Sequence, residues 1–196
     1  MSGVPWDASY QDGPAPWDVE QPQQAIVRLA AEGGFTGAVL DAGCGTGDNA
    51  IHLAALGLSV FGFDVAESAI AIARERAQAR GLEVDFAVAD AFALDRVGRT
   101  FQTVLDSGLF HTFDADERSR YAASLATVTE PGATVYVLCF SDEGPDTGPH
   151  PISRNDLAAA FDAASGWRIA AIEPTRILTR FHADGAPAWL ATIQRA

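Results

Sequence analysis

The stretch Ala38-Val39-Leu40-Asp41-Ala42-Gly43-Cys44-Gly45-Thr46-Gly47 decides the fold of this chain. It begins as an apolar run typical of a buried strand and ends in a glycine-rich turn, and a helical pattern follows at once over residues 48–56. Such a strand–turn–helix corner directs backbone N–H groups and the positive end of a helix dipole toward a ligand. The glycines allow the backbone to approach that ligand closely. We therefore expect a ligand-binding corner after the first strand of an α/β sheet.

Three kinds of ligand are common at such a corner: nucleoside triphosphates, dinucleotides and S-adenosylmethionine (SAM). The triphosphate loop requires a lysine, and this chain contains none. The dinucleotide fingerprint Gly-x-Gly-x-x-Gly needs its third glycine at position 48, where Asp48 would repel a pyrophosphate. SAM has no phosphate, and acidic residues suit its ammonium and sulfonium groups. We expect SAM, with a nicotinamide-dependent oxidoreductase and a SAM-binding module without turnover as the alternatives.

Acidic residues close four successive predicted strands. In chain order they are Asp41, Asp64, Asp90 and Asp106, at the end of the first strand and of strands expected over residues 59–63, 83–89 and 102–105. Ligands of open α/β sheets bind beyond the carboxyl ends of the strands. We therefore expect all four carboxylates at the cofactor. Asp64 is expected to accept hydrogen bonds from the ribose hydroxyls and Asp90 from the adenine amino group, while Phe92 covers the ring.

These motifs resemble those of class I SAM-dependent methyltransferases, in the same order, over roughly residues 38–140. The segment 40–47 is similar to motif I, Phe63-Asp64 to motif II, and Ala89-Asp90-Ala91 to the third, adenine-contacting motif. The resemblance implies a Rossmann-like, doubly wound α/β fold. Its seven-stranded sheet would be mostly parallel with a C-terminal antiparallel hairpin, and helices would cover both faces.

A second, weaker resemblance concerns the subgroup. The segments 7–10, 16–22, 105–111 and 138–141 are similar to small bacterial methyltransferases of the thiopurine and tellurite-resistance types and to relatives that methylate heterocycles. Gln21 departs from that pattern, because relatives often carry an arginine there. The remaining expected cofactor contacts are Trp17, Gly43, Cys44, Gly45, Thr46, Gly47, Asp48, Asn49, Val65, Ala91 and Ser107. The product would be S-adenosylhomocysteine (SAH).

Composition limits the partners. The net charge of −13 would repel nucleic acid and an anionic membrane surface. No apolar run reaches transmembrane length, and two cysteines do not form a disulfide framework. No metal-ligand motif is present. We expect a cytoplasmic enzyme, monomeric or homodimeric, that acts on a small molecule.

The first twenty residues carry Trp6, Tyr10 and Trp17, whereas disordered tails are usually poor in aromatic residues. We interpret residues 1–20 as a lid over the cofactor or substrate and residues 21–196 as one domain. Tyr10 is expected to contact the substrate.

Beyond the core motifs, the pattern predicts helices over residues 23–32, 67–80, 114–129 and 154–164. Asp114 with Glu117, and Ser153, are expected N-caps. Pro131-Gly132 is expected to form a turn into a strand over 134–140, and three final strands are expected over 167–173, 176–182 and 187–195. The glycine- and proline-rich segment 142–151 is either a passive connection or a substrate loop.

Methyl transfer from SAM needs mainly positioning and desolvation, since the leaving group is already good. A base is needed only when the nucleophile arrives protonated, and His111, after the fourth strand, is the best candidate. The alternative for His111 is a structural hydrogen bond to a loop carbonyl or packing on Phe113. Phe110, Phe113 and Phe140 are expected to line the substrate pocket with His111 and Tyr10. We expect methylation at O, N or S of a small aromatic or heterocyclic acceptor.

Overall fold

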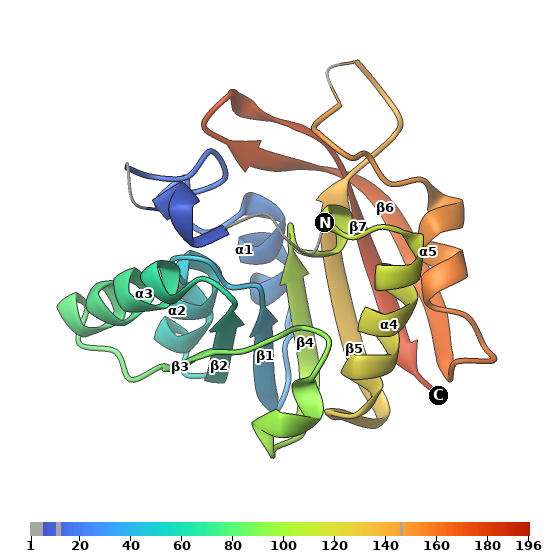
Figure 1. Ribbon diagram of the computed structural model, residues 1–196, viewed down its shortest axis with the longest axis horizontal. Helices are drawn as coiled ribbons and strands as arrows, with labels where there is room; N and C mark the ends of the chain where they lie inside the picture. The colour runs from blue at the N-terminus through green and yellow to red at the C-terminus, as the bar shows by residue number, and fades with distance from the viewer. Residues whose placement is uncertain (1–5, 11–12, 146) are drawn as a thin grey trace.

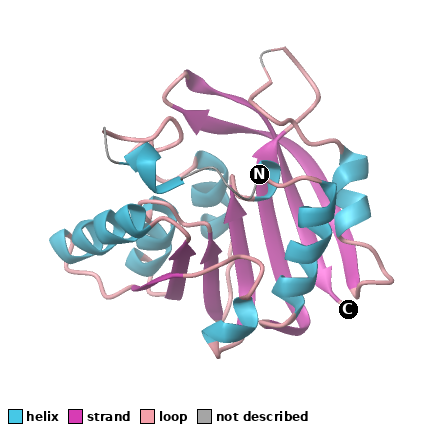
Figure 2. Ribbon diagram, in the orientation of Figure 1, coloured by secondary structure: helices cyan, strands magenta, loops and turns pink. Residues whose placement is uncertain are grey.

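The computed structural model describes residues 6–10, 13–145 and 147–196, and these form one α/β sandwich (Figures 1 and 2). One seven-stranded sheet has the order β3-β2-β1-β4-β5-β7-β6. The strands are β1 (Ala38–Ala42), β2 (Ser59–Asp64), β3 (Asp85–Val88), β4 (Phe101–Ser107), β5 (Thr129–Phe140), β6 (Trp167–Thr179) and β7 (His182–Arg195). The helices are α1 (Gln24–Ala31), α2 (Asp48–Ala55), α3 (Glu67–Ala79), α4 (Ala115–Ala126) and α5 (Arg154–Ala160). Short 3-10 turns are η1 (Trp6–Tyr10), η2 (Leu94–Val97) and η3 (Phe110–Thr112).

The pairing confirms the predicted fold class. Strands β1 to β5 pair in parallel with one another, whereas β7 pairs antiparallel with both β5 and β6. The strand order reverses between β1 and β4, so the carboxyl ends of these two strands flank a topological switch point. Ligands of open α/β sheets bind at such a point. The glycine turn after β1 therefore lies at the predicted ligand-binding end of the sheet.

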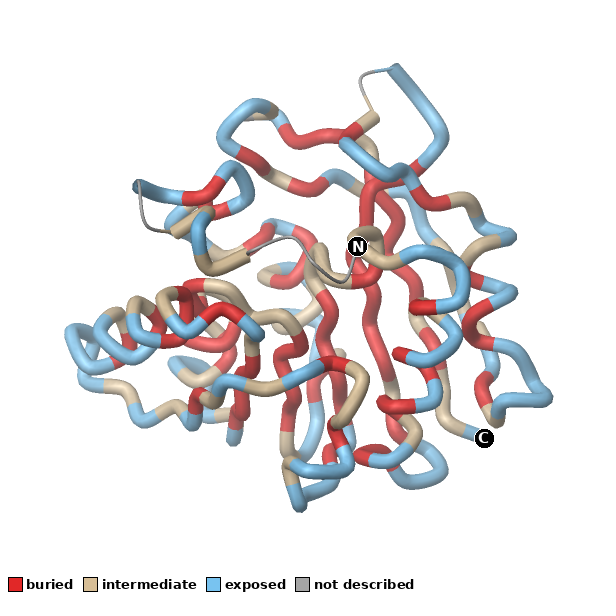
Figure 3. The backbone as a smooth tube through the Cα atoms, viewed as in Figure 1, coloured by how far each residue is buried: buried red, intermediate tan, exposed pale blue. Residues whose placement is uncertain are grey.

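Two hydrophobic layers separate the sheet from its helices. Side chains alternate between the faces of a strand, so Leu40 packs in the layer under α4 and α5, where Tyr121 is fully buried. Val39 packs in the opposite layer with Ile70 of α3 and residues of α1 and α2. Figure 3 shows the buried positions concentrated in the strands, with the helices exposed on their outer sides. The sheet is thereby covered on both faces.

Local sequence signals determine two helix starts. The Asp114 carboxylate accepts a hydrogen bond from the Glu117 N–H, and the Asp114 N–H donates to the Glu117 carboxylate, so the predicted capping box is present at α4. Ser153 forms a second capping box, with Asp156, at α5. Both helices end earlier than expected, because α4 stops at Ala126 and α5 at Ala160.

Two turn predictions were wrong. Pro131-Gly132 do not interrupt β5, which already begins at Thr129; the pair instead lies where the register with β4 shifts. The three expected C-terminal strands are two, because β6 continues through Pro174. Strand β6 is the edge of the sheet, and a proline there costs no ladder hydrogen bond on the open side.

Segments that are distant in sequence gather beyond the carboxyl ends of β1 to β5 (Figure 1). They are the N-terminal segment, the loop after β5 and the tip of the β6–β7 hairpin. The Gln23 side-chain amide both accepts from the Leu178 N–H and donates to the Leu178 carbonyl, at 2.7 and 3.0 Å. The Arg180 N–H donates to the Pro16 carbonyl at 2.9 Å. Among the described helices, none is long and apolar enough to cross a membrane.

Candidate active site

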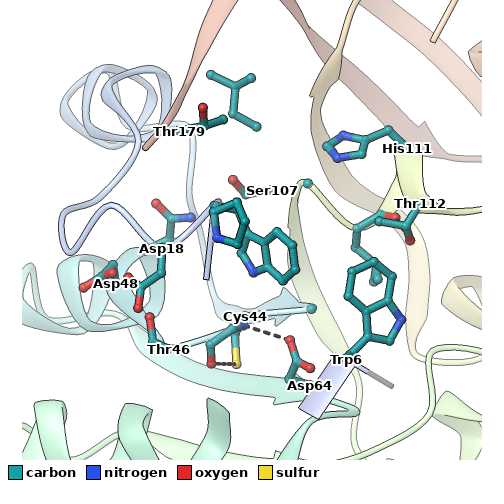
Figure 4. Close-up of a pocket in the computed structure, with 18 of the residues that line it drawn as sticks. Trp6, Asp18, Cys44, Thr46, Asp48, Asp64, Ser107, His111, Thr112 and Thr179 are labelled. Carbon is teal, nitrogen blue, oxygen red and sulfur yellow. Dashed lines mark hydrogen bonds between the residues drawn. The ribbon is translucent and has the colours of Figure 1, made fainter. Parts of the chain in front are cut away.

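A cavity of about 880 Å³ lies at this end of the sheet. Its wall combines the glycine turn, the ends of β2 to β4, the N-terminal segment, the loop after β5 and the hairpin tip (Figure 4). The structure brings most of the predicted site residues to it. Those at the wall are Tyr10, Trp17, Gly43, Cys44, Gly45, Thr46, Asp48, Asn49, Asp64, Val65, Asp90, Ala91, Phe92, Ser107, His111, Phe113 and Phe140.

The glycine turn forms one side of the cavity. Gly45 has φ +53°, and a Cβ there would lie 3.2 Å from the Tyr10 hydroxyl, so the turn and the N-terminal segment approach closely over this residue. Gly47 has φ +84° and begins α2, but it does not line the cavity. A Cβ at Gly47 would meet the Phe86 ring at 2.9 Å. Gly47 therefore serves helix–sheet packing rather than the predicted ligand contact.

Two of the strand-end carboxylates face the cavity. Asp64 accepts hydrogen bonds from the Gly45 N–H at 3.0 Å and from the Ala66 N–H at 2.9 Å, and burial raises the pKa of its carboxyl. Asp90 accepts from the Phe92 N–H at 2.9 Å. Each carboxylate oxygen can accept more than one hydrogen bond, so both remain able to bind donors of a ligand.

The other two carboxylates do not line the cavity, which corrects the prediction for Asp41 and Asp106. Both lie inside their strands rather than beyond them, and both are almost fully buried. Asp106 accepts from the Leu109 and Phe110 N–H groups at 3.0 and 3.1 Å and so shapes the loop that carries His111. Burial raises the pKa of each carboxyl to about 7.

The predicted aromatic wall is present except for Phe110. That ring is fully buried and stacks on Phe161, with 5.7 Å between centroids. Phe92 and Phe113 pair at 4.9 Å at the cavity wall. Phe140 lies against the imidazole of His111, with 4.5 Å between ring centroids.

The described part of the N-terminal segment covers the cavity with aromatic rings. Trp17 packs edge-on against Trp6 and Tyr10, at 5.5 and 6.1 Å, and its Nε1–H donates to the Tyr10 hydroxyl at 2.8 Å. The Asp7 carboxylate accepts from the backbone N–H and the hydroxyl of Ser68, at 2.7 and 3.1 Å. Since α3 has no cap of its own, Asp7 caps its first turn. Residues 1–5 and 11–12 of the predicted lid lie outside the described residues.

An arginine that the sequence reasoning missed fastens this segment to the glycine turn. Arg76 of α3 donates to both oxygens of Asp18, at 3.2 and 3.1 Å, to Thr46 Oγ1 at 2.7 Å and to Asp48 at 3.0 Å. Burial raises the pKa of Asp48, while Arg76 opposes that effect. The pattern of α3 offered no signal, because Arg76 reads as an ordinary exposed helix residue.

The hairpin tip was missing from the predicted site, and the loop after β5 was predicted there only as one of two alternatives. Ile177, Leu178 and Phe181 add apolar surface to the cavity, and 79% of Phe181 is exposed. His150, in the loop, lines the cavity with a left-handed backbone at φ +54°, which is uncommon for a residue other than glycine. The loop therefore contributes to the wall, as the substrate-loop alternative requires.

His111 stands at the far side of the cavity from the glycine turn and points into it (Figure 4). Its Nδ1 accepts a hydrogen bond from the Phe140 N–H at 3.4 Å. Burial, aided by the nearby His150 and Arg118, lowers the pKa of His111 to about 3. The imidazole is therefore neutral at physiological pH.

The charges of the cavity decide which ligand fits. Five aspartates line it, and no arginine does among the described residues. A pyrophosphate would lack cationic partners here. A ligand with ammonium and sulfonium charges would instead find carboxylates of opposite charge.

The sequence family described as a methyltransferase domain matches residues 39–132. The 2-heptyl-1-hydroxyquinolin-4(1H)-one methyltransferase of Mycobacteroides abscessus is 38% identical over 166 residues, which is 83% of this chain and 72% of that protein.

The chain belongs to the SAM-dependent methyltransferases. A protein solved in work on the conversion of a disulfide bond into a thioacetal group during echinomycin biosynthesis is 37% identical, with a TM-score of 0.87 over 97% of this chain and 90% of that one. The magnesium protoporphyrin IX methyltransferase of Synechocystis PCC 6803, solved with bound SAM, shares the fold at 24% identity, with a TM-score of 0.64 over 87% of this chain and 76% of that one.

The cofactor of this methyltransferase is SAM, as predicted. Asp64, Asp90 and the glycine turn all line the cavity. The oxidoreductase alternative is therefore abandoned.

Proposed function

We propose that this methyltransferase transfers the methyl group of SAM to O, N or S of a small aromatic or heterocyclic acceptor. The observation that carries the proposal is one continuous cavity with two chemically different ends. Asp64 lies on one side and His111 on the other (Figure 4), and Asp90, Phe140 and the apolar hairpin tip also line the cavity. A flat apolar acceptor would gain from stacking on rings such as Phe140.

The Mycobacteroides relative supports this acceptor class, since the substrate in its name is a hydroxylated heterocycle. SAM supplies an electrophilic methyl group when it is bound. The protein's own contribution is to hold the acceptor in line and to exclude water. We propose that residues 1–20 act as the lid, with Asp7, Pro16 and Asp18 as its attachment points.

The test has two stages. Thermal shifts with SAM, SAH and NADH should show stabilisation by SAM and SAH only, because a ligand at about 100 times its Kd adds roughly 2.7 kcal/mol to the folded state. SAH release should then be measured with hydroxyquinolones, phenols, thiols and ring amines. Binding of SAM without SAH release from any acceptor would favour a binding module without turnover.

A further inference from the structure

The hydrogen bond at Nδ1 of His111 determines which of its ring nitrogens carries the hydrogen. In a neutral imidazole one ring nitrogen carries the hydrogen and the other accepts. Because Nδ1 already accepts from the Phe140 N–H, the hydrogen of His111 is on Nε2. Among the described residues Nε2 has no hydrogen-bond partner, and the ring lines the cavity. The atom offered to the acceptor is therefore an N–H, which cannot take a proton.

The surroundings of His111 hold it in this state. Phe140 covers one side of the ring, at 4.5 Å between centroids. Two basic groups face it: Arg118 of α4, which is paired with Asp156 of α5 at 2.9 Å, and His150 of the loop after β5. Burial and the guanidinium of Arg118 both disfavour an imidazolium. The positive charge of Arg118 also favours negative charge on whatever His111 binds.

Apart from His150 and His182, no described histidine or carboxylate is available as a base at this end. The carboxylates at the cavity wall belong to the opposite end or are held by Ser68 and Arg76. His182 is engaged at Nδ1 by Thr179 Oγ1, at 2.8 Å, on the hairpin tip. His150 remains, and its exposed side chain is part of the test below.

We propose that the acceptor is an acidic hydroxyl compound, such as a phenol or an N-hydroxy heterocycle, that is bound as its oxyanion by the Nε2–H of His111. This inference rests on the proposed function and narrows its acceptor class. The acceptor oxygen donates a lone pair to the methyl carbon, the carbon–sulfur electrons remain on sulfur as SAH leaves, and no proton moves in the site. An oxyanion is the better nucleophile, so ionisation in solution replaces general-base catalysis.

The experiment measures the pKa of a bound acceptor directly. 4-Nitrophenol changes colour when it ionises, so its titration can be followed in the complex of the full chain with SAH. The wild-type protein should lower the pKa of the bound phenol. His111→Gln, whose side-chain amide can donate from a similar position, should retain most of this shift, whereas His111→Ala should lose it and bind the oxyanion about 10- to 100-fold more weakly. His150→Ala should keep the shift.

Turnover gives a second measure. Over a series of hydroxyquinolines and phenols, the midpoint of the kcat/KM–pH profile should follow the pKa of each acceptor. A midpoint that stays constant across the series, with His111→Gln as inactive as His111→Ala, would show that His111 is a base and overturn the inference. An unshifted pKa of bound phenol, or a shift abolished by His150→Ala alone, would also overturn it. Failure of the proposed function appears differently, as absence of SAH release from every acceptor, and the colour titration still decides the role of His111.

Discussion

Replacement of Asp64 by alanine tests the placement of the cofactor. The carboxylate lines the cavity and is held by the N–H groups of Gly45 and Ala66, at 3.0 and 2.9 Å, which fix its orientation before a ligand arrives. Hydrogen bonds from two ribose hydroxyls to a charged acceptor are worth roughly 1.5–3 kcal/mol, which corresponds to about a 10- to 150-fold increase in the Kd for SAM. The glycine turn also loses its acceptor, so unfolding free energy should fall by roughly 1–3 kcal/mol.

Isothermal titration calorimetry with SAM would measure this effect, after circular dichroism has shown that the variant is folded. Asp64→Asn retains one acceptor oxygen and should give an intermediate Kd. Asp95→Ala removes the same charge from an exposed position outside the cavity wall and should leave the Kd unchanged. An unaltered Kd in folded Asp64→Ala would mean that the ribose lies elsewhere. Burial raises the pKa of Asp64, so SAM affinity should weaken with falling pH sooner than an ordinary aspartate would allow.

Three other perturbations address the lid, the arginine cluster and the buried carboxylates. Asp7→Ala should loosen the N-terminal segment by about 0.5–2 kcal/mol, which chymotrypsin would report as faster cleavage near Tyr10. Asp7→Asn keeps a capping oxygen and should not be cleaved faster. Equal cleavage of the two variants would refute the capping role. Arg76→Met leaves buried Asp18 without its cation and should lower the free energy of unfolding in urea by about 3–5 kcal/mol. Adding Asp18→Asn should restore part of that free energy. Full stability of Arg76→Met would contradict this reasoning. Burial raises the pKa of Asp106 to about 7, above its unfolded value near 4, so the stabilisation by its protonated form is lost as pH rises from about 4 through 7. Asp106→Asn should therefore gain Tm relative to wild type over that range, and a constant difference would exclude this titration.

The cofactor end of the cavity was predictable because its signals are local. A buried strand, a glycine turn and a helix lie within twenty residues, and each depends on neighbouring residues alone. Asp64 is the last residue of β2 and Asp90 follows the end of β3, so both reach the ligand side. Asp41 and Asp106 are one residue short of their strand ends and turn into the protein. Sequence patterns locate strand ends less finely than one residue, so all four looked alike.

At the acceptor end, His111, Phe113 and Phe140 were predicted and line the cavity. The hairpin tip could not be predicted there, because it comes from a segment far away in the chain. Gln23 contacts Leu178 across 155 positions, and no pattern around either residue indicates the other. Arg76 joins the N-terminal segment to the glycine turn in the same non-local way.

The tautomer of His111 shows how such contacts decide chemistry as well as shape. From sequence, a histidine after the fourth strand is a candidate base, since an ordinary imidazole accepts a proton near neutral pH. In the fold, the backbone N–H of Phe140 occupies Nδ1 and thereby assigns the hydrogen to Nε2. Phe140 lies 29 residues away on the neighbouring strand β5. The same side chain thus changes from proton acceptor to hydrogen-bond donor through one backbone contact, and the acceptor it suits changes from a neutral hydroxyl to an oxyanion.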